Sequence, residues 1–250
     1  MRGGTSLTGK VAVLLGGSGG IGAASAFALA QAGARIAVVG GRDLARAETV
    51  ASSLPGNGHR AYAVDIANTC ELNALSACVA DELGRADILI NGAGFTRAVP
   101  HGDLDALDDE LIDKLMICNV RAPIAAVRAF RTLLAADRDG LVVNISSIAA
   151  TTAVGSNIAY CAAKSAMDTM GAALARALAP DIRVISVAPG AVDTDFVPGR
   201  DQAASERIAA STPLRRLASP EDVADVVLAC ATHLRFTTGS VVQVDGGRHL

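Results

Sequence analysis

The sequence predicts an α/β fold in which a doubly wound, parallel sheet of seven strands lies between two layers of helices. Three observations predict it. Short β-rich runs recur along the chain and are continuously apolar, as strands buried on both faces should be. Helical stretches of crossover length separate these runs, which favours parallel strands. Apolar residues make up 51% of the 250 residues, enough for one sizeable core.

The elements follow one another in a regular order. We expect strands at 10–16, 35–40, 60–64, 87–91, 141–145, 183–188 and 240–244. We expect helices at about 20–32, 43–54, 69–83, 105–135, 156–179 and 220–233. One long irregular stretch, 191–212, follows the sixth strand, and loops of that length in compact domains are often lids. The sequence therefore predicts a single Rossmann-type domain over 1–250, in three αβα layers, with a substrate lid near 191–212.

Composition excludes several functional classes. A net charge of −3 without any Lys/Arg run gives no reason to expect a nucleic-acid partner. No uncharged apolar stretch reaches the roughly 18 residues that predict a membrane span. The five cysteines are scattered and never form C-x-x-C, and the four histidines lack metal-ligand spacing. We therefore expect reduced thiols in a cytoplasmic protein without a metal site.

The stretch GGSGGIG at 16–22 directly follows the apolar run VAVLL. A glycine-rich turn between a strand and a helix lets backbone N–H groups approach a pyrophosphate closely. Two patterns fit: Gly17, Gly19 and Gly22 satisfy G-x-G-x-x-G, whereas Gly16, Gly20 and Gly22 satisfy G-x-x-x-G-x-G. Local spacing leaves both registers open, together with a turn that binds nothing.

Further motifs follow in a fixed order. These are NGAG (91–94), Asn119, NISS (144–147), YCAAK (160–164), PGAVDT (189–194) and VDGG (244–247). With them the chain resembles the short-chain dehydrogenase/reductase family, in its single-domain NAD(P)-dependent branch, from Lys10 to the C-terminus. The family's loop, T-G-x-x-x-G-x-G, implies the register Gly16, Gly20 and Gly22. The resemblance also implies a homotetramer packed through the helices near 105–135 and 156–179 and the last strand.

The resemblance implies four catalytic residues, Asn119, Ser147, Tyr160 and Lys164. Tyr160 and Lys164 are four apart on an expected helix and so share one face. A neighbouring ammonium and a cationic oxidised nicotinamide both favour the phenolate, which would lower the tyrosine pKa from about 10. Ser147 would hydrogen-bond the substrate oxygen, and Asn119 would hold a water that links Lys164 to solvent. Ser146, the competing serine, is interpreted as structural.

The resemblance also implies the cofactor contacts. Asp65 would hydrogen-bond the adenine amino group, the NGAG stretch would pass the adenosine ribose, and 189–194 would hold the nicotinamide carboxamide. The full set is Gly16, Ser18, Gly20, Ile21, Gly22, Gly41, Arg42, Asp65, Ile66, Asn91, Ala93, Gly94, Tyr160, Lys164, Pro189, Gly190, Val192 and Thr194.

The end of the second strand favours NADP over NAD. NAD-preferring members of the family carry Asp where this chain has Gly41, and the guanidinium of Arg42 suits a 2′-phosphate. NAD stays open as the alternative, because Gly19 stands where many NADP members carry a basic residue. Leu15 replaces the loop Thr and Gly92 the second Asn of NNAG, and both replacements could loosen the cofactor site.

The expected substrate is a modest, partly apolar ketone or secondary alcohol, since 95–97, 148–158 and the lid offer mostly small or apolar groups plus Phe196. One alternative is a 3-oxoacyl-thioester reductase acting on an acyl carrier protein. Arg138 stands at one position where such relatives carry an arginine, but Asp181 stands at the other. A second alternative is a non-catalytic dinucleotide-binding sensor, for which Leu15 and Gly92 are the main support.

Overall fold

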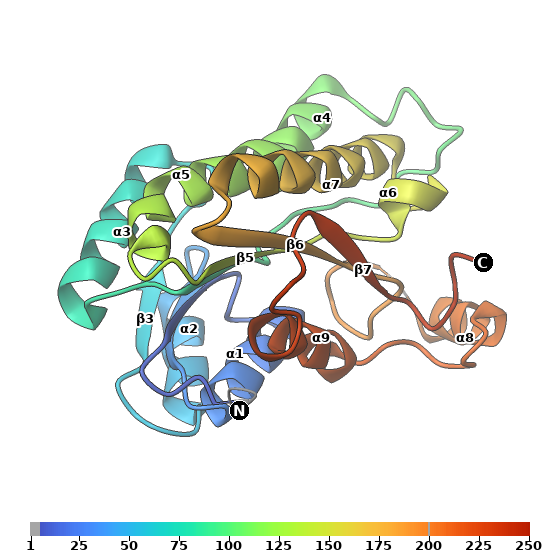
Figure 1. Ribbon diagram of the computed structural model, residues 1–250. Helices are drawn as coiled ribbons and strands as arrows, with labels where there is room; N and C mark the ends of the chain where they lie inside the picture. The colour runs from blue at the N-terminus through green and yellow to red at the C-terminus, as the bar shows by residue number, and fades with distance from the viewer. Residues whose placement is uncertain (1–5, 200) are drawn as a thin grey trace.

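The computed structural model describes residues 6–199 and 201–250. Its centre is one sheet with the strand order β3-β2-β1-β4-β5-β6-β7 (Figure 1). All six pairings between neighbouring strands are parallel, and the predicted fold class is confirmed. The strands are β1 (Val11–Leu15), β2 (Arg35–Gly40), β3 (Arg60–Ala63), β4 (Ile88–Asn91), β5 (Gly140–Ile145), β6 (Ile182–Pro189) and β7 (Ser240–Val244).

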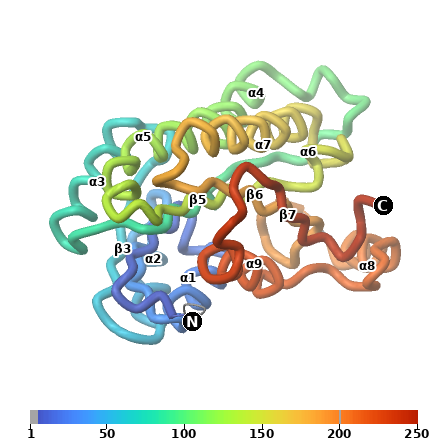
Figure 2. The backbone as a smooth tube through the Cα atoms, in the orientation of Figure 1, coloured from blue at the N-terminus to red at the C-terminus, as the bar shows by residue number. Residues whose placement is uncertain are grey.

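Helices cover both faces of the sheet (Figures 1 and 2). On one face pack α1 (Gly20–Gln31), α2 (Leu44–Ser53) and α9 (Pro220–Thr232). On the other pack α3 (Thr69–Leu83), α5 (Ala122–Ala135) and α7 (Ile158–Leu178). Along β1, Ala12 and Leu14 enter the first core while Val13 and Leu15 enter the second, because successive side chains of a strand point to opposite faces. This double burial explains the continuously apolar strands.

The stretch 105–135, predicted as one helix, is three elements: α4 (Asp109–Met116), a π-helical turn η1 (Ile117–Arg121) and α5. The chain becomes helical only at Asp109, because the Asp108 carboxylate accepts a hydrogen bond from the Leu111 amide at 2.7 Å and caps the helix. Pro123 explains the wide turn. Its nitrogen has no hydrogen to donate to the carbonyl of Asn119 four residues earlier, and its ring would crowd that carbonyl in a regular helix.

Two helices were not predicted. A short helix α6 (Ala149–Thr152) precedes α7, which begins at Ile158 because the Asn157 side chain accepts a hydrogen bond from the Tyr160 amide. The stretch 191–212 is not irregular throughout, since Asp201 caps a helix α8 (Gln202–Ser211). Helix α8 contributes no buried side chain. Residues 1–5 of the predicted domain and Arg200 of the predicted lid lie outside the described residues.

Within residues 6–199 and 201–250, no helix combines the length and apolar character that a bilayer span requires. In the same part of the chain, no three His, Cys, Asp or Glu side chains are grouped so that they could hold a metal ion.

Candidate active site

A cleft of about 1540 Å³ runs along the carboxyl edge of the sheet. All strands of a parallel sheet end at the same edge, so the loops that follow β1 to β6 meet there. Each of these six loops contributes lining residues. The volume exceeds the roughly 300–1,000 Å³ of ordinary small-molecule sites, which suits a dinucleotide together with a second molecule.

The glycine-rich turn closes one end of the cleft between β1 and α1. Gly16 has a φ of +81°, and a Cβ there would lie 2.7 Å from the Ala93 amide nitrogen. A Cβ on Gly22 would overlap the carbonyl oxygen of Gly16. Gly19 is the N-cap of α1 and has no side chain that could cap the helix. No capping side chain therefore occupies the backbone amides of the first turn. These features fit a turn that holds an anion at the start of α1.

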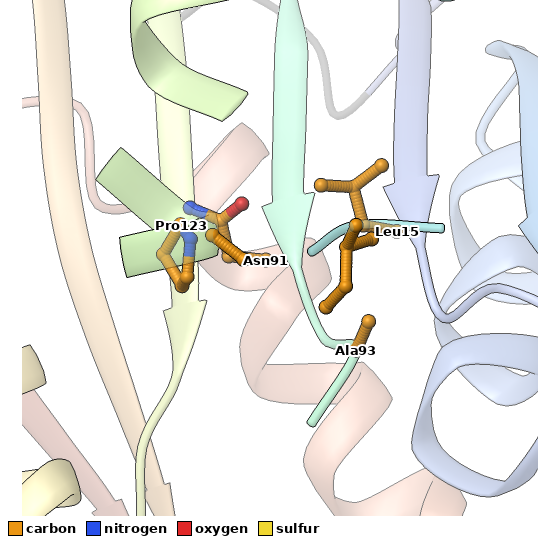
Figure 3. A pocket seen from close by; sticks show the side chains of 6 residues that line it. Leu15, Asn91, Ala93 and Pro123 are labelled. Atoms are coloured by element: carbon orange, nitrogen blue, oxygen red, sulfur yellow. The ribbon is translucent and has the colours of Figure 1, made fainter. Parts of the chain in front are cut away.

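Backbone hydrogen bonds tie the glycine-rich turn to its neighbours. The amides of Gly16 and Gly17 both donate to the Val39 carbonyl at 3.0 Å, and the Gly92 amide donates to the Leu15 carbonyl at 3.0 Å. Leu15 itself is buried beside Ala93, Asn91 and Pro123, with no room for a water molecule between them (Figure 3). Backbone hydrogen bonds and apolar packing therefore hold the turn that a threonine hydroxyl was expected to tie.

The cleft carries two arginines close to the glycine-rich turn. Arg42 is 90% exposed and pairs with Asp65 at 3.3 Å. Arg46 also lines the cleft, and its guanidinium lies over Gly19, 3.0 Å from where a Cβ would stand. Asp43 caps α2, because its side chain accepts a hydrogen bond from the Arg46 amide. Gly41 has open space around it.

Ser147, Tyr160 and Lys164 all line the middle of the cleft. Ser147 follows β5, and the other two lie one turn apart on α7. Lys164 is 4% exposed and donates from Nζ to the Ile145 carbonyl oxygen at 2.8 Å. Its Nζ lies 5.6 Å from the centroid of the Tyr160 ring. The strand end and the helix thus bring a hydroxyl, a phenol and an amine to one wall.

Burial raises the pKa of the Tyr160 phenol to about 12, and the Ser147 side chain opposes this rise. The direction differs from the lowered pKa expected for this tyrosine. Burial is the largest cause of this rise, and the Lys164 ammonium donates its hydrogen bond to the Ile145 carbonyl and not to the phenol. A phenol with a raised pKa is protonated at neutral pH and is therefore a proton donor.

Burial lowers the pKa of Lys164 to about 8, while the charge of Asp168 acts in the opposite direction. The amine therefore titrates close to physiological pH, unlike an exposed lysine.

Asn119 lies in the π-helical turn and is fully buried. Its Nδ2 donates to the carbonyl oxygens of Leu115 and Phe95, each at 3.0 Å. Its Oδ1 is buried without a hydrogen-bond partner among the described residues. The amide is thus rigidly held with one acceptor unused, but Asn119 does not itself line the cleft.

The lid side of the cleft follows β6. Phe196 lies with its ring centroid 6.2 Å from that of Tyr160, at 52° between the planes. Val192 forms a parallel bridge with Ala218, which ties the start of this segment to the body of the protein. Val154, Val197 and Ile208 add apolar surface, and Arg248 from the C-terminal segment adds a cation.

The structure brings every predicted site residue to the cleft except Asn119 and Asn91. Asn91 is buried, and its Nδ2 donates to the Asn144 Oδ1 at 2.8 Å. Sequence reasoning missed five charged residues that line the cleft, namely Arg46, Glu110, Asp113, Lys114 and Arg248. Helical periodicity offered no signal for Arg46, because α2 begins at Leu44 and Arg42 precedes its cap.

A parallel sheet with a glycine-rich turn at its carboxyl edge defines a dinucleotide-binding α/β protein. The chain belongs to the short-chain dehydrogenase/reductase family: a family model described as enoyl-(acyl carrier protein) reductase matches residues 16–249. Members of this family use NAD(P), and this chain is an oxidoreductase acting on carbonyl or alcohol groups.

Individual relatives match over nearly the whole chain. A Streptomyces violaceoruber protein named as a ketoacyl reductase of the granaticin polyketide synthase is 36% identical, covering 96% of this chain and 96% of its own. The cis-4-hydroxycyclohexanecarboxylate dehydrogenase of Sinomonas cyclohexanicum is 36% identical, covering 95% and 96%. A dehydrogenase/reductase structure from Sinorhizobium meliloti 1021 has a TM-score of 0.88 at 31% identity, covering 98% and 97%.

Proposed function

We propose that this oxidoreductase transfers a hydride between NADP(H) and a small ketone or secondary alcohol, with Tyr160 as the general acid/base. The observation that carries the proposal is the gathering of Ser147, Tyr160 and Lys164 on one wall of the cleft that the glycine-rich turn closes.

The residues present fit a dinucleotide. The uncapped start of α1 and the side-chain-free surface at Gly16 and Gly22 suit a pyrophosphate. When bound, the nicotinamide ring supplies or accepts the hydride. Asp65 and Ile66 would lie at the adenine end, with Pro189, Gly190, Val192 and Thr194 at the nicotinamide end.

In reduction, the Tyr160 phenol donates its proton to the substrate oxygen, to which the Ser147 hydroxyl also donates a hydrogen bond. The raised pKa of Tyr160 keeps that proton in place until the oxygen becomes basic. Lys164 stabilises the phenolate that forms and helps to return a proton to it. The unused acceptor of Asn119 suits a water in that return path. In oxidation, the same groups act in reverse.

The preference for NADP rests on Arg42 and Arg46, two guanidinium groups at the adenine end of the cleft. The exposed Arg42–Asp65 pair is worth at most about 1 kcal/mol, so a 2′-phosphate can replace the carboxylate as partner of Arg42. Arg46 offers positive charge beside Gly19, where the sequence lacks a basic residue.

A small molecule suits the substrate end better than an acidic carrier protein. Its walls include Val154, Phe196 and Ile208. Arg138, which stands where carrier-binding relatives present an arginine, pairs with Asp181 at 2.8 Å, so its charge is compensated. One relative is named for cis-4-hydroxycyclohexanecarboxylate, a cyclic hydroxy acid of the size and chemistry that we propose for the substrate.

We also propose one domain over 1–250, with 191–212 as a lid that orders over substrate. The absence of buried side chains in α8 supports a movable lid. A homotetramer is proposed from the family resemblance, with light scattering as its test. The five cysteines are all free, which supports a reducing compartment such as the cytoplasm.

The experiment that tests the proposal is a paired fluorescence titration with NADPH and NADH, followed by a panel of ketones and alcohols with the preferred cofactor. We expect tighter binding of NADPH and measurable turnover of a small apolar ketone. Cofactor binding with no turnover across the panel would favour the sensor. Turnover of only an acyl-carrier-protein thioester would favour the 3-oxoacyl reductase.

A further inference from the structure

Asp168 lies one helical turn beyond Lys164 on α7, and the proposed reaction does not use it. Residues four apart on a helix have Cβ atoms about 5–6 Å apart, so Lys164 and Asp168 are neighbours on one face. The Oδ1 atom of Asp168 is buried and has no hydrogen-bond partner among the described residues. A carboxylate oxygen in this position is costly unless something compensates its charge.

The surroundings of Asp168 are polar although they lie inside the helix–sheet layer. The hydroxyls of Ser146, which directly follows β5, and of Ser186, within β6, act on the Asp168 carboxylate and favour its ionised form. Ser146 Oγ is also a buried atom without a hydrogen-bond partner in the described part of the chain. The two serines do not complete the hydrogen bonds of the carboxylate, and Lys164 is the cation that acts on it.

Lys164 needs such a charge as much as Asp168 does. Its side chain is almost completely buried, and its one hydrogen bond goes to a neutral carbonyl, that of Ile145. Burial lowers the pKa of Lys164, and Asp168 is the group that raises it. In turn, burial raises the pKa of Asp168, and Lys164 acts against that rise.

Other titratable groups on the elements packed against α7 do not act on this pair. They are Asp109, Glu110, Asp113 and Lys114 of α4, Cys118 and Arg121 of η1, and Arg183 of β6. On α7 itself, Tyr160 lies one turn before Lys164, while neither Cys161 nor Arg176 acts on either member of the pair.

We propose that Asp168 is a positioning residue that keeps Lys164 protonated and, through Lys164, controls the proton of Tyr160. The catalytic part of this inference rests on the proposed function, but the effect of Asp168 on Lys164 does not. Removing the carboxylate leaves a buried ammonium without a counter-charge, so that ammonium loses its proton at a lower pH. Tyr160 then loses a neighbouring cation, so its phenolate forms at a higher pH.

The sequence allows a direct measurement, because it contains only three lysines, Lys10, Lys114 and Lys164. Lysine labelled with ¹³C at Cε gives three resonances, which Lys10→Arg and Lys114→Arg variants assign. In an NMR titration of the full chain, we expect Asp168→Asn to lower the Lys164 midpoint by about one pH unit, a tenfold change in proton affinity. Asp168→Glu should restore most of the shift. Asp225→Asn, which removes an exposed carboxylate of α9, is the matched control. An unchanged Lys164 midpoint in Asp168→Asn would overturn the proposal.

Ser186→Ala covers the case in which Asp168→Asn fails to fold. It removes a hydroxyl that favours the ionised carboxylate, so the Lys164 midpoint should fall in the same direction by a smaller amount. If Asp168→Asn does not fold, an unchanged Lys164 midpoint in a folded Ser186→Ala protein would count against the proposal.

The pH dependence of turnover then tests the effect on Tyr160. In Asp168→Asn we expect the alkaline limb of carbonyl reduction and the acid limb of alcohol oxidation both to move to higher pH, because both limbs report the proton of Tyr160. A merely structural defect would lower both rates without moving either limb. A shifted Lys164 resonance with unmoved limbs would mean that Asp168 acts on Lys164 but that the proposed role of Tyr160 fails.

Discussion

The Nζ atom of Lys164 lies 5.6 Å from the centroid of the Tyr160 ring and donates its hydrogen bond to the Ile145 carbonyl. The amine therefore lies beside the phenol while its hydrogen bond is directed at the end of β5. This arrangement lets burial dominate the titration of both side chains. It raises the pKa of Tyr160 to about 12 and lowers that of Lys164 to about 8.

Replacing Tyr160 tests the general acid directly. We expect Tyr160→Phe to reduce turnover by about 10²–10⁴-fold, because the substrate oxygen loses its proton donor. NADPH binding, measured by fluorescence, should change little. The only other tyrosine, Tyr62, donates to Glu82 on the protein surface, so Tyr62→Phe should keep ordinary turnover. A Tyr160→Phe protein as active as Tyr62→Phe would rule out the assignment.

The buried amine makes stability depend on pH. The Lys164 pKa is about 8 in the folded protein and near 10.5 when unfolded, so between these values the unfolded chain binds more protons. The contribution of Lys164 to the free energy of unfolding therefore increases as pH rises through that window. Lys164→Met removes this pH dependence. We expect it to raise the free energy of unfolding at both pH values, by about 2–3 kcal/mol more at pH 6.5 than at pH 10. Urea unfolding at the two pH values measures the difference. An equal effect at both pH values would contradict a buried lysine with a lowered pKa.

The two arginines at the adenine end should determine cofactor preference. We expect Arg42→Ala and Arg46→Ala each to weaken NADPH binding by about tenfold, since each removes a charge-assisted contact of roughly 1.5 kcal/mol to the 2′-phosphate. NADH binding should be nearly unchanged. Arg131→Ala, on the exposed side of α5, is the control. Parallel losses for both cofactors would show that the arginines do not recognise the 2′-phosphate.

The glycine-rich turn has no room for a side chain at its third glycine. We expect Gly22→Ala to abolish measurable NADPH binding and to lower the melting temperature by several degrees, because its Cβ would overlap the Gly16 carbonyl oxygen. Gly102→Ala introduces the same methyl group into open space and should leave the melting temperature unchanged. Calorimetry with and without NADPH compares the two. Tight NADPH binding by Gly22→Ala would show that the turn adapts, contrary to the proposed cradle.

The sequence by itself determined the parallel sheet and the edge of that sheet at which the cleft lies. Continuous apolar runs separated by crossover helices predict a parallel sheet buried on both faces, and such a sheet gathers all its carboxyl-end loops at one edge. The family resemblance, together with this topology, assigned Gly16, Ser147, Tyr160 and Lys164 to one cleft although they are distant in the chain.

Only the tertiary structure decided what depends on packing between segments. The burial of Asn91 against Asn144 comes from the pairing of β4 with β5, which one-dimensional spacing does not specify. The placement of Arg46 over Gly19 and the neutralisation of Arg138 by Asp181 likewise bring together residues far apart in sequence. Burial set the directions of the Tyr160 and Lys164 pKa shifts, because desolvation depends on every element that covers a group.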